Sequence, residues 1–67
     1  MTLRWKGRRE VEAPEVDAFL LEIEGVCRKH GMSITHEDGH GSFMIEDLGE
    51  PALKWLHEAI DERSPKR

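Results

Sequence analysis

The sequence predicts an α+β fold: a helix, a β-hairpin and a second helix in one small domain. Residues 14–30 and 50–62 repeat apolar side chains at the three- and four-residue spacing of a helix. Between them, residues 32–47 alternate apolar and polar side chains on both sides of a glycine-containing turn, as the strands of a hairpin do. Because two strands alone leave open edges, we expect homodimerisation to complete a four-stranded antiparallel sheet.

The length of the chain, 67 residues, limits how much apolar surface one copy can bury. Cys27 is the only cysteine, so no disulfide can form within one copy. No cluster of histidine and cysteine offers a closed four-ligand structural metal site. Self-association is the remaining source of stability, and the sequence therefore predicts a homodimer.

No apolar run approaches the roughly 18 residues of a membrane span, and no cleavable leader is recognisable. Together with the unpaired cysteine, this predicts a soluble, cytoplasmic protein that does not engage a membrane. The formal net charge of −4 argues against a large phosphate-binding surface. The bases gather at both ends of the chain, whereas residues 11–62 hold thirteen acids against three bases.

Residues 1–13 are predicted to be a basic N-terminal arm or a short edge strand. Leu3 and Trp5 alternate with basic residues, which suits stacking and phosphate contact with single-stranded nucleic acid. The alternative is a partly ordered terminus with Trp5 packed onto the domain. Residues 14–62 are predicted to be the domain, and residues 63–67 a basic, disordered tail.

The first helix, 14–30, has recognisable ends. Pro14 suits the first helical position, and Gly31 suits the left-handed residue that follows a helix. Cys27 is expected to be an inert core thiol, because it lies on the apolar stripe. That stripe consists of Val16, Phe19, Leu20, Ile23, Val26 and Cys27.

The hairpin has a register that its alternation fixes. Ile34 and Ile45 share one face only if they pair across the strands, which also pairs His36 with Phe43 on the apolar side. The turn then closes over Gly39-His40 or Asp38–Gly41, with His40 at the tip.

The second helix, 50–62, begins with Pro51 in its first turn and is ended by Ser64-Pro65. Trp55 lies beside its apolar stripe. His57, four residues before Asp61, is expected to form a solvated surface pair with it. The stripe consists of Ala52, Leu53, Leu56, Ala59 and Ile60.

Residues 36–40 spell H-E-x-x-H, the zinc-protease motif, but that motif requires both histidines on one helical face. Asp38 and Gly39 disfavour a helix interior, and the flanking alternation demands strands. In a hairpin, His36 and Glu37 point to opposite faces, so the protease interpretation fails. A looser metal site from His36, Asp38 and His40 across a dimer axis stays open.

The basic end of the first helix leads directly into the first hairpin strand. We expect this to gather two bases and up to three imidazoles at one corner, able to hold an anion such as a phosphate. Phe43 beside His36 offers a stacking surface for a base. No serine or cysteine has a convincing base beside it, so the sequence predicts no enzyme, no catalytic residue and no cofactor.

The core H-E-D-x-H-G, together with residues 19–34 and Trp55-Leu56, resembles a group of very small proteins encoded by phages and prophages. The resemblance covers about residues 16–57 and extends to the phage anti-defence proteins that counter the Hailong system. It implies a homodimer that sequesters a single-stranded DNA oligomer signal in the host cytoplasm, without catalysis. The matching positions expected to bind are Arg28, Lys29, His30, His36, Asp38, His40 and Phe43.

The leading hypothesis is therefore a phage-type homodimer that sequesters a nucleotide or short single-stranded DNA oligomer and so counters host antiviral defence. Arg28 and Lys29 would neutralise phosphates, His36 and His40 would donate hydrogen bonds, and Phe43 would stack. One alternative is an acidic protein-interaction module or an inhibitor of a host enzyme. A second alternative is a small metal-binding protein.

Overall fold

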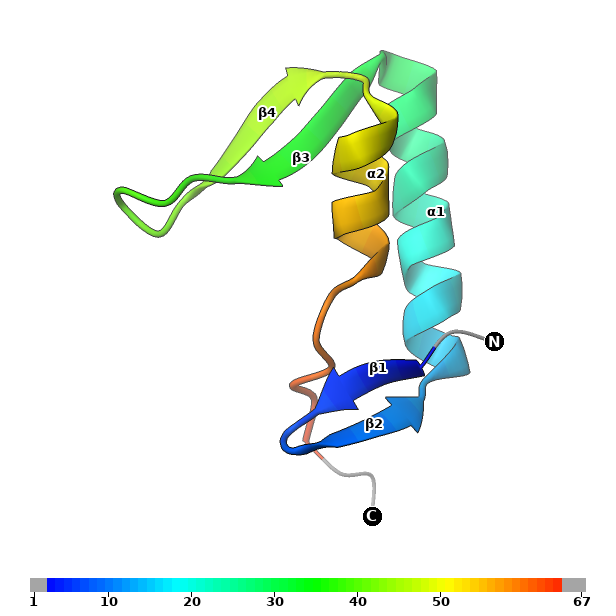
Figure 1. Cartoon of the computed structure of the whole chain (residues 1–67). Coiled ribbons are helices and arrows are strands. Elements are labelled where there is room, and N and C mark those ends of the chain that lie inside the picture. The colour runs from blue at the N-terminus through cyan, green and yellow to red at the C-terminus, as the bar shows by residue number, and fades with distance from the viewer. Residues whose placement is uncertain (1–2, 65–67) are drawn as a thin grey trace.

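The computed structural model describes residues 3–64 and confirms a small α+β fold with two helices (Figure 1). Its strands form two separate two-stranded antiparallel sheets, β1 with β2 and β3 with β4. The elements, in chain order, are β1 (Leu3–Lys6), β2 (Arg9–Glu12), α1 (Pro14–His30), β3 (Met32–His36), β4 (Phe43–Asp47) and α2 (Glu50–His57).

Helix α1 is the axis of the molecule, and α2 lies beside its C-terminal half (Figure 1). The β3–β4 hairpin projects from the C-terminal end of α1, and the β1–β2 hairpin lies at the other end. The radius of gyration is 13.0 Å, whereas a compact domain of this length has about 10.9 Å. A single copy is therefore extended.

Helix α1 begins and ends where the sequence predicts. Pro14 occupies the first turn, and Gly31 follows with φ 70°, its amide bonded to the carbonyl of Cys27. Only part of the predicted stripe is covered, however. Leu20 and Cys27 are buried, whereas Phe19 and Val26 are 60 % and 58 % exposed. One side of the stripe thus has no cover in a single copy.

The β3–β4 register is the predicted one, with Ile34 opposite Ile45 and His36 opposite Phe43. Both helices pack against β3, which leaves β4 as the outer strand. All five residues of β4 are exposed.

The prediction of a helix over 50–62 is wrong at its C-terminal end, because α2 stops at His57. Beyond it the chain turns down to β1, where the amide of Asp61 donates to the carbonyl of Trp5 at 2.8 Å. The guanidinium of Arg4 takes the carbonyls of His57 and Ala59 at 3.2 and 2.7 Å. These bonds replace the ones that another helical turn would have made.

Residues 3–12 form a hairpin of their own, where the sequence suggested an arm or an edge strand. Gly7 has φ 65° and sits first in the two-residue turn, a position that suits glycine. Arg4 is only 4 % exposed and is also paired with Asp17, so this hairpin is tied to α1 and to the chain after α2.

The first residue of the predicted disordered tail, Arg63, is held in place by contacts within the molecule. Arg63 is held by Asp61 through backbone and side-chain bonds at 3.0 Å, and its guanidinium lies 3.7 Å from Glu15. Residues 65–67 of that tail lie outside the described residues.

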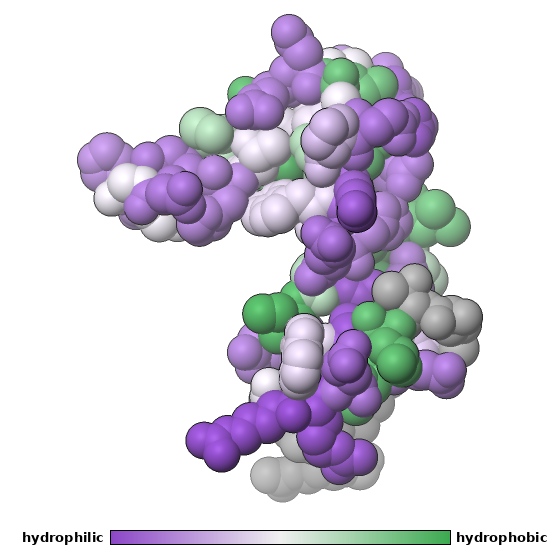
Figure 2. All heavy atoms as spheres, in the orientation of Figure 1, coloured by the Kyte–Doolittle hydropathy of each residue, from purple (hydrophilic) through white to green (hydrophobic). Residues whose placement is uncertain are grey.

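The core is small. Among the described residues, the buried apolar side chains are Ala13, Leu20, Cys27 and Leu53. Large apolar side chains from several elements are exposed, and Figure 2 shows such side chains on the surface at both ends of the molecule. This chain therefore presents more apolar surface than a self-sufficient domain of its size needs.

Candidate binding groove

The H-E-D-x-H-G stretch is a loop-shaping motif in this structure. β3 ends at His36, and residues 38–40 form a turn. The carboxylate of Glu37 folds back over this turn and accepts the amides of Gly39 and His40, each at 2.6 Å. The carboxylate of Glu37 therefore closes the loop. Residues 36–40 form a strand end and a turn, and not the helix that a zinc protease motif requires.

His36 and Asp38 meet at the end of β3, where Nδ1 of His36 lies 2.7 Å from Oδ1 of Asp38. His40 lies instead at the tip of the hairpin, with Nδ1 3.5 Å from Glu37. Across residues 3–64, no three or more His, Cys, Asp or Glu side chains are placed to hold a metal ion. The structure therefore gives no support to a metal site at His36, Asp38 and His40.

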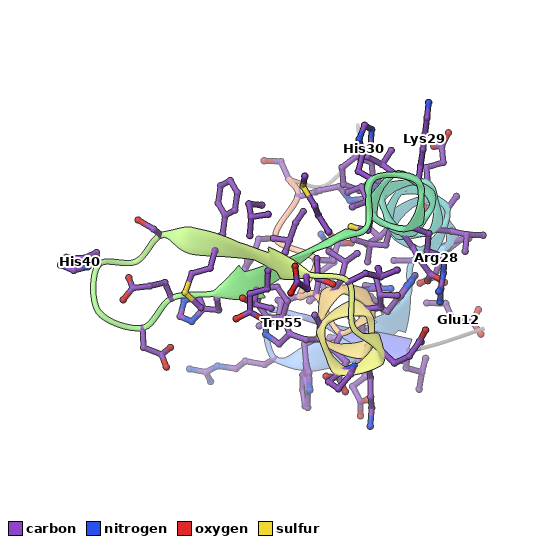
Figure 3. All side chains as sticks on the ribbon, turned by 90° about the horizontal axis from the view of Figure 1, so that it is seen from above. Glu12, Arg28, Lys29, His30, His40 and Trp55 are labelled. Carbon is purple, nitrogen blue, oxygen red and sulfur yellow. The ribbon has the colours of Figure 1, made fainter. Side chains whose placement is uncertain are left out.

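A groove of about 410 Å³ runs between the end of the hairpin and the first turns of α2. The ring of Trp55 faces that of His36, with centroids 6.4 Å apart and planes inclined by 36°. Trp55 lies between the hairpin and α2 in Figure 3. The groove is lined by Thr35, His36, Asp38, Glu46, Pro51, Ala52 and Trp55.

Thr35 contributes an unusual polar atom to this groove. Its hydroxyl oxygen is buried, and within the described part of the chain it has no hydrogen-bond partner. Since buried polar groups are almost always paired, this atom is a candidate contact for a bound polar group once the Thr35 side chain turns its hydroxyl into the groove. Glu46 and Asp38 add two carboxylates, and none of the lysines and arginines among residues 3–64 lines the groove.

Phe43 lies opposite His36, as predicted, but it contributes to a neighbouring apolar hollow. This hollow of about 310 Å³ is lined by Ile34, Phe43, Trp55, Leu56 and Ala59. Trp55 therefore borders both spaces. The sequence marked Trp55 only as a neighbour of a helical stripe, and no spacing rule tied it to His36.

The predicted basic corner does not assemble. Lys29 and His30 lie at the C-terminal end of α1, whereas His36 lies at the far end of β3, about 13 Å along the strand. Figure 3 shows His40 at the hairpin tip, far from the labelled Arg28, Lys29 and His30. The strand that was expected to bring these side chains together instead separates them.

Arg28 forms ion pairs with two carboxylates of this molecule. Its guanidinium bonds Glu24 at 2.8 Å and Glu50 at 3.1 Å, and these two partners raise the pKa of Arg28. Glu24 also receives Nε2 of His57 at 2.6 Å, so His57 pairs with α1 and not with Asp61 as expected. The hydrogen bonds from Arg28 and then His57 lower the pKa of Glu24.

The N-terminal bases are also largely used within the molecule. Lys6 bonds the carbonyl of Arg63 at 2.7 Å and lies 3.5 Å from the buried carboxylate of Asp61. Hydrogen bonds from Arg63 hold the pKa of Asp61 well below its usual range. Arg8, in the β1–β2 turn, and Arg9, the first residue of β2, are exposed. The first hairpin is therefore mainly a structural element.

Comparison with known proteins finds no matching family model, no matching curated protein and no matching solved structure. The resemblance to phage anti-defence proteins stays a prediction. Within residues 3–64, neither helix has the length and apolar character needed to cross a membrane.

Proposed function

We propose that this chain binds a nucleotide or short single-stranded DNA oligomer, as a homodimer, in the groove between His36 and Trp55. The observation that carries the proposal is the facing pair of rings, 6.4 Å apart, beside a buried hydroxyl that lacks a partner. The resemblance described above further suggests that the ligand is an oligonucleotide signal of host antiviral defence. No catalytic residue is part of the proposal.

The chemistry of the groove suits a nucleobase. The exposed ring of Trp55 offers a stacking surface, which every base can use. The carboxylates of Asp38 and Glu46 accept hydrogen bonds from exocyclic amino groups or ribose hydroxyls, and the hydroxyl of Thr35 can donate one.

The charges in the groove indicate which end of a nucleotide enters it. Asp38 and Glu46 repel phosphate, so the phosphate is expected to point outward. Lys29 and His30 remain candidates for phosphate contact, but only with a ligand longer than one nucleotide, because the length of β3 separates them from the groove. Binding of a single nucleotide should therefore depend weakly on salt, and binding of an oligomer more strongly.

The test is a titration of adenosine monophosphate and of fluorescein-labelled single-stranded DNA oligomers, read by calorimetry and fluorescence anisotropy. Loss of one stacking platform costs about 1–3 kcal/mol, so Trp55→Ala should weaken binding roughly 5- to 150-fold. The matched control is Trp5→Ala, which removes a similarly exposed tryptophan (51 % against 43 % for Trp55) at the other end of the molecule. If neither probe binds the wild type, or if both variants lose equal affinity, the proposal fails.

A second candidate is the acidic protein-interaction module, and the outer side of α1 favours it. Phe19 and Val26 are 60 % and 58 % exposed and lie two turns apart on one face of the helix, with exposed Glu22 between them. A partner with an apolar patch bordered by bases would complement this surface. If this candidate is correct, a variant with Phe19→Ala and Val26→Ala should lose a stoichiometric host protein that the wild type and Trp55→Ala both retain.

A further inference from the structure

The outer edge of β4 is the least covered part of the fold. All five of its residues are exposed, and Phe43 and Ile45 are 68 % and 56 % exposed. An open edge that carries large apolar side chains is a template for pairing with another strand. The sequence around it provides no proline to block such pairing.

The hydrogen-bond phase of the hairpin shows which groups of β4 are available. The amide of Glu37 donates to Ser42, and the amide of Leu48 donates to Gly31, each at 3.0 Å. In an antiparallel ladder such bonded pairs alternate with non-bonded ones, so Met44 and Glu46 also direct their backbone groups toward β3. The backbone groups of the intervening residues, Phe43, Ile45 and Asp47, therefore point to the open edge.

The exposed area matches what a dimer interface would cover. The chain exposes 5515 Å², whereas a compact protein of 7.7 kDa exposes about 4,300 Å². The excess of roughly 1,200 Å² exceeds the ~800 Å² that each partner buries in a standard interface. A second copy of this chain is the occupant that β4 can match, because the strand is complementary to itself.

We infer that β4 pairs antiparallel with β4 of a second copy, with Met44 on the twofold axis, to give the sheet order β3-β4-β4-β3. In this register Phe43 lies opposite the partner's Ile45, an aromatic and β-branched pair of the kind that stabilises sheets. Glu46 then lies opposite the partner's Ser42, away from other acids.

Neighbouring registers are less favourable. An axis at Ile45 would place Phe43 opposite the partner's Asp47, and an axis at Glu46 would place two carboxylates opposite each other. An axis at Phe43 would pair fewer residues and leave Ile45 opposite the partner's Gly41. The matching of charges and of apolar side chains therefore favours the register with Met44 on the twofold axis.

The pairing has a consequence for the binding groove, and this step rests on the proposed function. Thr35 pairs with Met44, so a line across the sheet runs from Thr35 through both copies of Met44 to the partner's Thr35. Opposite residues of an antiparallel pair share a face, which places both grooves on one side of the sheet. The two β3 strands are then about 14 Å apart, within reach of one short oligomer.

Cysteine substitution tests the register directly. Met44 would form a non-hydrogen-bonded pair with its counterpart, at a Cα separation of about 4.5 Å, which a disulfide can span. Met44→Cys should therefore give a covalent dimer on mild oxidation, whereas Ile45→Cys and Phe43→Cys should not. The wild type, whose Cys27 is buried, is the control.

Sedimentation of the wild type and of Ile45→Lys completes the test. The wild type should be a dimer, and Ile45→Lys should be a monomer with unchanged helical circular dichroism. Leu21→Lys, at an equally exposed apolar site on α1, should stay dimeric.

The outcomes separate this inference from the ligand proposal. A monomeric wild type would overturn both the homodimer and the pairing. A dimer without the Met44→Cys cross-link, or with an Ile45→Cys cross-link, would overturn the pairing alone. In the cross-linked Met44→Cys dimer, an oligomer should bind at least 10-fold more tightly than adenosine monophosphate. Equal affinity for the oligomer and for adenosine monophosphate would overturn the shared site. Failure of both probes to bind would overturn the proposed ligand.

Discussion

Nε2 of His57, the last residue of α2, lies 2.6 Å from Oε1 of Glu24 in the middle of α1. The second oxygen of the same carboxylate accepts Nε of Arg28 at 2.8 Å. Arg28 continues to Glu50 at the start of α2. Polar side chains therefore join the two helices at both ends of α2, beside the buried Leu53.

Glu24 should make the stability of the fold sensitive to acid. Its pKa is lowered below the ordinary 4.5, mainly by Arg28 and then by His57, so the folded state binds the proton less tightly than the unfolded state. Its stabilising contribution is then complete above pH 4.5 and is lost as the pH falls through the lowered pKa. Urea midpoints measured from about pH 6 to pH 3 should fall less steeply for Glu24→Gln than for the wild type. Glu22→Gln, at an exposed position, is the control. If the urea midpoints of the two variants fell equally steeply with pH, Glu24 would have no special part in the acid sensitivity.

Arg4→Ala should destabilise the protein by on the order of 2–4 kcal/mol. The substitution leaves Asp17 without its ion pair and removes the donor for the carbonyls of His57 and Ala59. Chemical denaturation followed by tryptophan fluorescence measures the change. Arg8→Ala removes an exposed base from the same hairpin and should cost less than about 0.5 kcal/mol. Similar losses in both variants would mean that the buried guanidinium has no special role.

Gly39→Ala should destabilise the hairpin loop only when Glu37 is present. A Cβ at residue 39 would lie 2.6 Å from Oε1 of Glu37 and would push the carboxylate off the two amides that it accepts. We expect a cost of about 1 kcal/mol in the wild type and almost none in a Glu37→Ala background. Gly41→Ala is the control, because φ 72° makes its strain independent of Glu37. Additive losses for residues 37 and 39 would contradict the coupling.

Ser33→Ala should cost about 1 kcal/mol, measured by thermal or urea unfolding. Ser33 is fully buried, and its hydroxyl accepts the amide of Gly49 at 2.9 Å, which fixes the start of α2 against β3. The exposed Ser42→Ala should be nearly neutral. A neutral Ser33→Ala would show that water replaces the lost acceptor.

Local patterns predicted the local structure well. Pro14 and Gly31 fixed the limits of α1, and the alternation around Ile34 and Ile45 fixed the hairpin register, because each signal depends on neighbours in the chain. The end of α2 was wrong, since the partner that ends it is Arg4, more than fifty residues away in the sequence.

The site was harder to predict than the fold. His36 and Phe43 were placed together correctly, because strand pairing determines both positions. The prediction of a basic corner was wrong, because Lys29 precedes the start of β3 whereas His36 ends it, and the extended strand holds the two apart. Trp55 was missed as a groove residue, since its distance from His36 depends on how α2 packs against β3.

The bonds from Arg4 to the carbonyls of His57 and Ala59 also affect the order in which the protein can fold during synthesis. The β1–β2 hairpin leaves the ribosome before the other elements, but the carbonyls that its buried guanidinium bonds belong to residues 57 and 59. Until those residues have emerged, Arg4 can pair with Asp17 but lacks the two carbonyls that it bonds in the folded protein. α1 and the β3–β4 hairpin can form from contiguous sequence, so the β1–β2 hairpin, although translated before them, is expected to reach its final position after them.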